Sequence, residues 1–260
     1  MKLKDVMIKL EELSPQAMAE DWDNSGLMCG RGDSEISSVL LAVDATDEVI
    51  EEAVLSGADL LLTHHPLIFK GIKSVTEDHL TGRRLLKLIQ ADVACYAMHT
   101  NFDVIGMADE AADRLGLQDP EVLQVTFEDS LSKEGIGRCG KLKTPMSLKE
   151  CAELVKEVFL IDSVRVYGDL KAKISRVAIS PGSGKHMSEY ALRCGAEVLI
   201  TGDIDHHEGT DAVALGLNII DAGHFGLEKI FVGYLKDYFM KEMPEIEVSA
   251  ASQKEPFITV

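Results

Sequence analysis

Short apolar runs alternate along the chain with segments in which apolar residues recur every three or four positions. The short runs end in glycine, proline or polar residues, and they predict buried strands. These strands are expected at residues 39–43, 59–62, 93–98, 164–167, 176–179, 197–200, 218–220 and 246–250. The periodic segments predict helices at residues 3–13, 15–19, 47–55, 81–89, 108–115, 148–159, 187–194, 211–215 and 227–240. Strands that alternate with helices in this way indicate an α/β protein.

The pattern changes between about residues 118 and 142. Residues 122–127 and 135–142 alternate weakly between apolar and polar positions, which predicts an antiparallel strand pair. We therefore place a domain boundary near residue 126. The predicted architecture is a discontinuous first α/β domain, residues 1–125 plus 228–260, and a second, inserted α/β domain, residues 126–227. Each domain is expected to hold a mixed sheet flanked by helices.

The two predicted domains contain an internal repeat. Val39–His65 aligned without gaps on Val177–Asp203, at an offset of 138, gives seven identities in 27 positions. The strand that follows ends in His99-x-x-x-Asp103 in the first half and, after a gap, in His224-x-x-x-Glu228 in the second. The repeat predicts two related α/β halves that face each other. Convergence of two ordinary βαβ units is the alternative.

Polar residues end several of the predicted strands. The strand at 59–62 runs into Thr63, His64, His65 and Pro66, and the proline stops the ladder. Ligands bind at this carboxyl edge of an open parallel sheet. Because adjacent side chains of an extended backbone point to opposite sides, we expect the two histidines to be able to serve different metal ions.

The candidate metal ligands are imidazoles and carboxylates at or just beyond these strand ends: His64, His65, Asp103, His224 and Glu228. This ligand set suits zinc, iron, manganese or similar divalent ions. One catalytic zinc needs three protein ligands and an open position, so five ligands indicate two ions between the domains that share a bridging carboxylate. Such a pair favours hydrolysis of a phosphoester or an amide-like C–N bond. The structural alternative is a hydrogen-bonded histidine at each strand end and a helix-capping role for the carboxylates.

No catalytic residue is assigned from the sequence. His99, Asp203 and His207 are candidates for orienting the ligands or contacting substrate. The single tryptophan, Trp22, lies in a polar turn at residues 21–26. Packing over that turn is its favoured role, and substrate binding is the alternative.

Two glycine-rich segments resemble nucleotide-binding motifs but fail the test of context. Gly135-x-Gly137-x-x-Gly140 follows an acidic stretch rather than a buried strand, so a turn or close backbone packing is expected there. The loop at residues 180–184 lacks the full phosphate-binding motif, although its backbone N–H groups are candidates for anion binding.

Composition and charge narrow the function classes. A formal net charge of −18 argues against a nucleic-acid or anionic-membrane partner, because both require a basic face. The five cysteines show no CxxC spacing, so we expect buried or free thiols in a reducing compartment, with neither a disulfide framework nor a zinc knuckle. With no signal-peptide pattern and no long apolar run, the chain is expected to be cytoplasmic.

Taken together, these motifs resemble the Nif-three-like proteins, often called GTP cyclohydrolase I type 2 homologues. The resemblance is carried by Thr63-His-His-Pro66, His99-Thr-Asn-Phe-Asp103, Thr201-Gly-Asp203 and Asp221-Ala-Gly-His224-x-x-x-Glu228, and residues 22–27 and 135–138 also fit. It implies two interlocked α/β domains, a homohexameric toroid and a dinuclear metal site on the five ligands above, with His99 as an orienting residue or an additional ligand. Longer members carry a large central insertion that this chain lacks.

Two functional hypotheses follow from the sequence. The first is a cytoplasmic metal-dependent hydrolase of a small phosphate- or purine-containing substrate. The second is a non-enzymatic metal-binding ring that acts as an interaction adaptor or metal chaperone. A ring that encircles DNA would need a basic lining, which the net charge of −18 disfavours.

Overall fold

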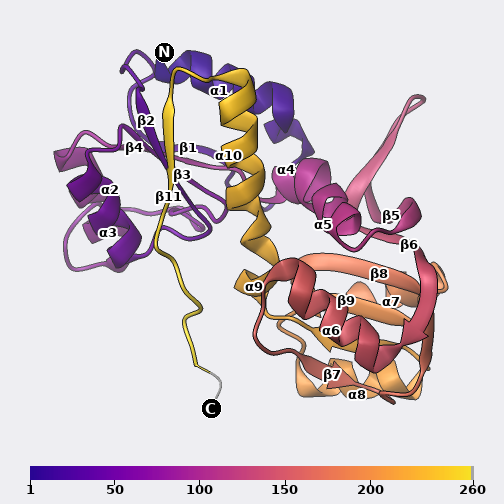
Figure 1. Cartoon of the computed structure of the whole chain (residues 1–260). Helices are drawn as coiled ribbons and strands as arrows, with labels where there is room; N and C mark the ends of the chain where they lie inside the picture. Colours follow the sequence, from indigo (N-terminus) through magenta and orange to yellow (C-terminus); the bar gives the residue numbers. More distant parts are fainter. Residues whose placement is uncertain (259–260) are drawn as a thin grey trace. The chain divides into compact units, whose positions relative to one another are not determined.

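The computed structural model describes residues 1–258, which divide into two compact units. Unit 1 comprises Met1–Phe102 and Phe231–Lys254, and unit 2 comprises Asp103–Ile230 and the C-terminal residues from Glu255. Each unit is built around its own mixed β-sheet flanked by helices (Figure 1). The α/β fold class and the two mixed sheets predicted from the sequence are therefore confirmed.

Unit 1 has a five-stranded sheet in the order β1-β4-β3-β2-β11. Its strands are β1 (Gly26–Cys29), β2 (Ser38–Ala42), β3 (Leu60–Thr63), β4 (Ala94–Ala97) and β11 (Glu247–Ala250). Its helices are α1 (Leu3–Leu13), η1 (Gln16–Met18), α2 (Asp47–Ser56), α3 (Leu80–Gln90), α4 (Thr100–Phe102) and α10 (Ile230–Glu242). All neighbouring strands are parallel except β1, which runs antiparallel to β4.

Both faces of this sheet are covered. Residues of α2 and α3, such as Ile50 and Leu88, pack with Leu40 and Leu61 of the sheet in one apolar cluster. Helices α1 and α10 lie on the other side (Figure 1). Parallel strands buried on both faces have apolar residues at successive positions, which is the pattern that made these strands predictable.

Unit 2 has a six-stranded sheet in the order β5-β6-β8-β9-β10-β7. Its strands are β5 (Gln118–Glu128), β6 (Lys133–Ser147), β7 (Arg165–Tyr167), β8 (Lys173–Ser183), β9 (Val198–Gly202) and β10 (Asn218–Asp221). Its helices are η2 (Asp103–Met107), α5 (Ala108–Arg114), α6 (Leu148–Phe159), α7 (Met187–Arg193), α8 (His206–Ala214) and α9 (His224–Glu228). The predicted antiparallel pair is β5 and β6, and β8, β9 and β10 are parallel.

The division between the units falls at Asp103, whereas the change of sequence pattern suggested a boundary near residue 126. Segment 103–125 belongs to unit 2 because η2 and α5 pack against β6. Buried Arg138 of β6 strengthens this attachment, since its Nε and Nη2 donate to Asp109 of α5 at 2.6 and 2.9 Å. The sequence pattern marks where antiparallel strands begin, which is later than the point where the packing changes.

The strand register bears out the internal repeat. In unit 1 Val39 pairs with Leu60, and in unit 2 Val177 pairs with Val198, so both strands are displaced by the same 138 positions. Gly57 and Gly195 end the intervening helices in equivalent left-handed conformations, with φ of 69° and 72°. The two units therefore share a βαβ core in identical register.

Two local features, β1 and the segment at 227–240, differ from the sequence expectation. Strand β1 was not predicted, because it is short and follows a polar turn. The single helix expected at 227–240 is two helices, α9 and α10. Within the described residues 1–258, no helix is both long and apolar enough to cross a membrane.

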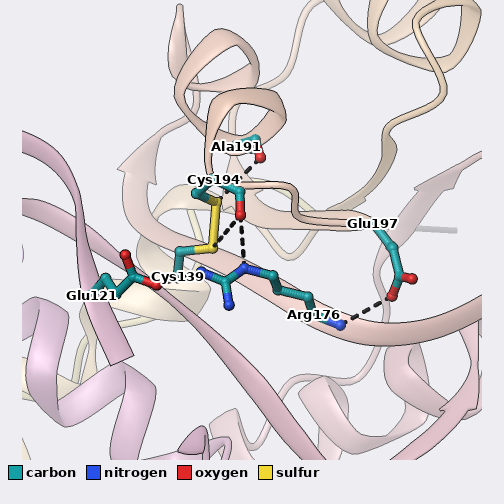
Figure 2. The surroundings of a disulfide bond; sticks show 6 residues. All are labelled: Glu121, Cys139, Arg176, Ala191, Cys194 and Glu197. Carbon is teal, nitrogen blue, oxygen red and sulfur yellow. Dashed lines mark hydrogen bonds and ion pairs between the residues drawn. A yellow bond between two sulfur atoms is a disulfide. The ribbon is translucent and has the colours of Figure 1, made fainter. Parts of the chain in front are cut away.

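Cys139 of β6 and Cys194, at the C-terminal end of α7, form a disulfide bond (Figure 2). The prediction of free thiols throughout was therefore wrong for this pair and right for Cys29, Cys95 and Cys151. The two cysteines are 55 residues apart and show no recognisable spacing, so only the packing of α7 on the sheet brings them together. Arg176 lies beside the bond and donates from Nε to the carbonyl oxygen of Cys194 at 2.7 Å.

Reduction of this disulfide is expected to lower the free energy of unfolding of unit 2 by about 2–4 kcal/mol, because it releases a closed loop in the unfolded chain. Urea unfolding with and without a dithiol reductant measures this difference. The Cys194→Ser variant should match the reduced protein and lose its response to reductant, while Cys29→Ser should keep it. Titration of five thiols, rather than three, in the denatured non-reduced protein would contradict the assignment.

Candidate functional site

Three imidazoles gather at the carboxyl ends of β3 and β4 in unit 1. His64 and His65 follow β3, and His99 follows β4. One ring nitrogen from each of the three lies within 4.8 Å of those from the other two. The ring centroids of His64 and His65 are 4.9 Å apart, and both lie within 5.4 Å of the His99 centroid. A donor cluster of this kind can hold a metal ion.

The expectation that His64 and His65 point to opposite sides was wrong. Successive N–H groups of a regular strand bond to opposite neighbours, but here the two histidine N–H groups donate to Ala42 and Val43, which are consecutive residues of one segment. The chain has thus left regular strand geometry after Thr63, where β3 ends. This bend brings both rings together on one side.

An acceptor oxygen holds Nδ1 of each of these rings. His64 Nδ1 bonds to Met98 O, His65 Nδ1 to Asp44 Oδ1 and His99 Nδ1 to Asp23 Oδ1, each at 2.7 Å. In a neutral ring an acceptor at this nitrogen fixes the proton on Nδ1, which makes Nε2 the nitrogen with the lone pair. Metal-ligating histidines show this arrangement, because it orients the ring and strengthens the donor.

Asp23 accepts several hydrogen bonds besides the one from His99. It accepts from His99 Nδ1, from Ser25 Oγ at 2.8 Å and from the backbone N and Oγ1 of Thr100 at 3.1 and 2.6 Å. Burial would by itself raise the pKa of Asp23, but the hydrogen bonds from His99, Thr100 and Ser25 outweigh it and hold the pKa well below its usual range. The carboxylate therefore stays ionised and keeps His99 in one orientation.

A second donor group lies in unit 2 at the carboxyl end of its sheet. His224 begins α9 and Glu228 ends it one turn later, so the helix brings His224 Nε2 to 3.0 Å from Glu228 Oε1. Asp203, beyond β9, accepts a hydrogen bond from the other ring nitrogen, with Oδ2 2.8 Å from His224 Nδ1. A nitrogen and an oxygen spaced at about 3 Å fit neighbouring ligands of one ion, each about 2.1 Å from it.

Gly182 leaves room for this pair. Its φ of +79° lies in the left-handed region, and a Cβ at this position would overlap Glu228 Oε1 and lie 3.7 Å from His224 Nε2. The loop at 180–184, which the sequence offered as an anion-binding loop, thus packs its backbone closely against the carboxylate. The positive φ favours glycine at this position.

The remaining candidates are Asp103 and His207. Asp103 is half-buried at the first position of η2, where unit 2 begins. His206 and His207 are exposed in the first turn of α8, which Asp205 caps by accepting from the backbone N–H of His207 at 2.8 Å. The structure therefore brings together His64, His65 and His99 in unit 1, and Asp203, His224 and Glu228 in unit 2. A carboxylate oxygen of Asp103 also lies within 4.8 Å of one of Glu228. His207 lies on the exposed surface of α8.

The sequence did not identify Asp23 and Asp44 as orienting residues. Asp44 does not cap α2, because Thr46 takes that role by accepting from Val49 N at 3.2 Å. The role of Asp44 could have been inferred from its position, because it follows β2 at the same sheet edge as the histidines. Asp23 gave a weaker signal, since it comes from a turn 76 residues before His99.

These features define an α/β protein with histidine–carboxylate clusters, suited to metal binding, at the carboxyl ends of its strands. Residues 1–256 match the model of a family described as Duf34/NIF3 (NGG1p interacting factor 3), and the chain belongs to this family. The family resemblance inferred from the sequence is thereby confirmed.

Named relatives and solved structures agree with this assignment. A Clostridium perfringens protein named GTP cyclohydrolase 1 type 2 homolog is 39% identical over 230 residues, which cover 88% of this chain and 87% of that protein. A Bacillus cereus protein related to NIF3 superposes with a TM-score of 0.91 at 26% identity, covering 100% of this chain and 99% of the other. Reduced HcgD from Methanocaldococcus jannaschii superposes with a TM-score of 0.84 at 29% identity, covering 97% and 98%.

Some relatives are longer. The alignment with a Staphylococcus aureus GTP cyclohydrolase 1 type 2 homolog runs over 364 positions and covers 99% of both proteins. Since this chain has 260 residues, that relative contains residues that this chain lacks. This difference agrees with the expectation of a missing insertion.

Replacing Asp44 with alanine is expected to weaken metal binding about 10- to 100-fold, because His65 loses the acceptor that orients its ring. Competition with a chromophoric chelator measures the affinity. Asp47→Ala is the matched control, since Asp47 is a nearby surface carboxylate that pairs with Arg83 and Arg84 instead of a histidine. Equal metal affinity in the two variants would show that Asp44 does not support the cluster.

Proposed function

We propose that this protein binds two divalent metal ions and uses them to hydrolyse a small phosphate- or purine-containing substrate. One observation carries the proposal: four histidines at the strand ends of the two units, His64, His65, His99 and His224, all have Nδ1 held by an oxygen. A structural histidine needs no particular tautomer, whereas a metal ligand needs a fixed donor nitrogen. The recurrence at four rings therefore favours metal binding over a packing role.

The proposed ligands are the five residues predicted from the sequence: His64, His65, Asp103, His224 and Glu228. The imidazoles supply neutral nitrogen donors, and the carboxylates supply the negative charge that offsets a divalent cation. Zinc, iron and manganese all accept this mixed set. When bound, two such ions would lower the pKa of a coordinated water and polarise a phosphoryl or carbonyl oxygen.

The other residues would support this chemistry without binding the ions themselves. Asp23, Asp44 and Asp203 hold His99, His65 and His224 through Nδ1, so the rings meet a metal or substrate in one orientation. His99 completes the imidazole cluster of unit 1 and is proposed as an additional donor or a contact to substrate. Gly182 keeps space open beside Glu228.

The comparisons support this class of function through the names of relatives. Several bacterial relatives, at up to 39% identity, are named GTP cyclohydrolase 1 type 2 homolog. A hydrolytic reaction on a purine nucleotide would agree with that name. We also propose, from the family resemblance, a homohexameric toroid, and a mass in solution near six times the 28.4-kDa chain would support it.

The purified protein is expected to carry close to two metal ions per chain, measured by elemental analysis. His65→Ala and Glu228→Ala should each lose metal and any metal-dependent hydrolysis, because each removes a proposed ligand. The matched controls are His79→Ala and Glu189→Ala, two exposed residues away from the clusters that should keep full metal content.

The outcomes separate the two functional hypotheses. Metal-dependent turnover of a member of a broad panel of nucleotides and phosphoesters supports the hydrolase. Full metal content without turnover across that panel favours the non-enzymatic adaptor or metal chaperone. A well-folded Glu228→Ala protein that retains all its metal would contradict the proposed ligand set.

A further inference from the structure

Two exposed aromatic side chains lie beside the imidazole cluster of unit 1. The ring centroids of Trp22 and Phe69 are 5.8 Å apart, and both rings contact His99, with centroids at 5.8 and 6.0 Å. His99 meets each of them edge-on. We call Trp22 and Phe69 together the aromatic platform.

Hydrogen bonds fix this platform against the cluster. Asn24, two residues after Trp22, donates from Nδ2 to the carbonyl oxygen of Ile68, the neighbour of Phe69, at 2.6 Å. Asp23, the residue next to Trp22, bonds to His99 Nδ1 at 2.7 Å. These hydrogen bonds connect the two loops to each other and to His99, so the fold of unit 1 fixes the position of the platform.

The exposure of the platform does not fit a packing role. Trp22 is 58% exposed and Phe69 is 51% exposed. Folding usually buries most of a large aromatic side chain, and an indole that served chiefly to cover its own turn would be largely buried. Exposed aromatic surface beside polar groups is typical of a ligand-binding site.

The geometry points to the class of ligand. Aromatic faces bind planar rings by stacking, and this contact is worth about 1–3 kcal/mol per nucleic-acid base. The planes of Trp22 and Phe69 are tilted by 45° at a centroid distance of 5.8 Å, which is too close for a third ring to enter between them. A ligand would therefore stack on an outer face of the platform.

The charges nearby favour a phosphate on that ligand. Phe69 is followed by Lys70 and Lys73, and both are exposed in a chain whose net charge is −18. Lys70 and Lys73, one and four residues after Phe69, are the cationic side chains of this segment that an anionic group of the ligand could contact. A planar heteroaromatic ring with a phosphate, as in a nucleotide, combines both features.

We propose that Trp22 and Phe69 form the base-binding part of the substrate site, on which the planar ring of a nucleotide stacks next to the imidazole cluster. This inference rests on the proposed function, because it names the substrate class of the same site. The two residues bind and position the ring and take no part in the chemical step.

The chain offers a direct probe, because Trp22 is its only tryptophan. Guanosine monophosphate should quench the tryptophan fluorescence of the purified metal-containing protein, after correction for absorption by the nucleotide. Guanosine, which has the ring alone, should quench with lower affinity, and ribose 5-phosphate, which has no ring, should not quench. Absence of quenching by either ring compound up to about 1 mM, the upper end of ordinary KM values, would overturn the proposal.

Variants test the contribution of each ring. Trp22→Ala and Phe69→Ala should each weaken binding of guanosine monophosphate by roughly 5- to 150-fold. Equilibrium dialysis measures binding to the Trp22 variant, which lacks the fluorescent residue, and fluorescence measures binding to the Phe69 variant. Trp22→Phe should restore part of the loss, because it returns an aromatic face. Leu55→Ala is the matched control, since Leu55 is also an exposed apolar residue of unit 1 and lies at the end of α2.

Metal content separates failure of this inference from failure of the proposed function. If Trp22→Ala binds the nucleotide as tightly as the unchanged protein, while metal content and hydrolysis persist, the platform is refuted and the hydrolase stands. If nucleotide quenches Trp22 but the protein holds no metal, the proposed function fails and the platform stands. A change of molecular mass in Trp22→Ala without a change in nucleotide affinity would instead make the aromatic pair a contact between copies of the chain.

Discussion

The hydrogen bond from a histidine Nδ1 to a fixed oxygen is the interaction on which the candidate site depends. An imidazole at a strand end can rotate and can carry its proton on either nitrogen. Asp44, Asp23 and the carbonyl of Met98 remove both freedoms in unit 1, and Asp203 does so for His224 in unit 2. Because these oxygens come from strand ends and the loops around them, the fold itself determines which nitrogen of each ring is available as a donor.

The parts of this arrangement that could be predicted from the sequence are those encoded in local pattern. Apolar runs ending in histidine identified β3 and β4, and His224 and Glu228 were identified as candidate ligands, although the short helix α9 that carries both was not predicted. The sequence could not show that Asp23 bonds to His99 across 76 residues, because the contact exists only after β1 pairs with β4. The Cys139–Cys194 disulfide could not be predicted either, because only the packing of α7 on the sheet of unit 2 brings the two cysteines together. His64 and His65 were assigned opposite directions because an ideal strand was assumed, whereas the chain bends after Thr63.

The internal repeat shows how two copies of one βαβ core came to supply different groups. At an offset of 138, Asp44 corresponds to Gly182 and His65 corresponds to Asp203. In unit 1 a carboxylate after β2 orients a histidine after β3, and in unit 2 a carboxylate after β9 orients a histidine after β10. The carboxylate–histidine pair of unit 2 therefore lies one strand further along its repeat than the pair of unit 1. Glycine at the vacated position 182 gives Glu228 the space that a side chain would occupy.

Because Trp22 and Asp23 are adjacent, an exposed aromatic surface and the orientation of a histidine in the cluster depend on the same loop. A single short loop presents the indole to solvent and, one residue later, supplies the carboxylate that sets the orientation of His99. A molecule that shifts this loop when it docks on the indole would also change the orientation of His99 in the cluster. Coupling between two binding sites is reciprocal. If the docked molecule changes the affinity of His99 for a metal ion by some factor, the bound ion would change the affinity for that molecule by the same factor. Cation and organic ligand would then bind cooperatively or antagonistically through one peptide unit.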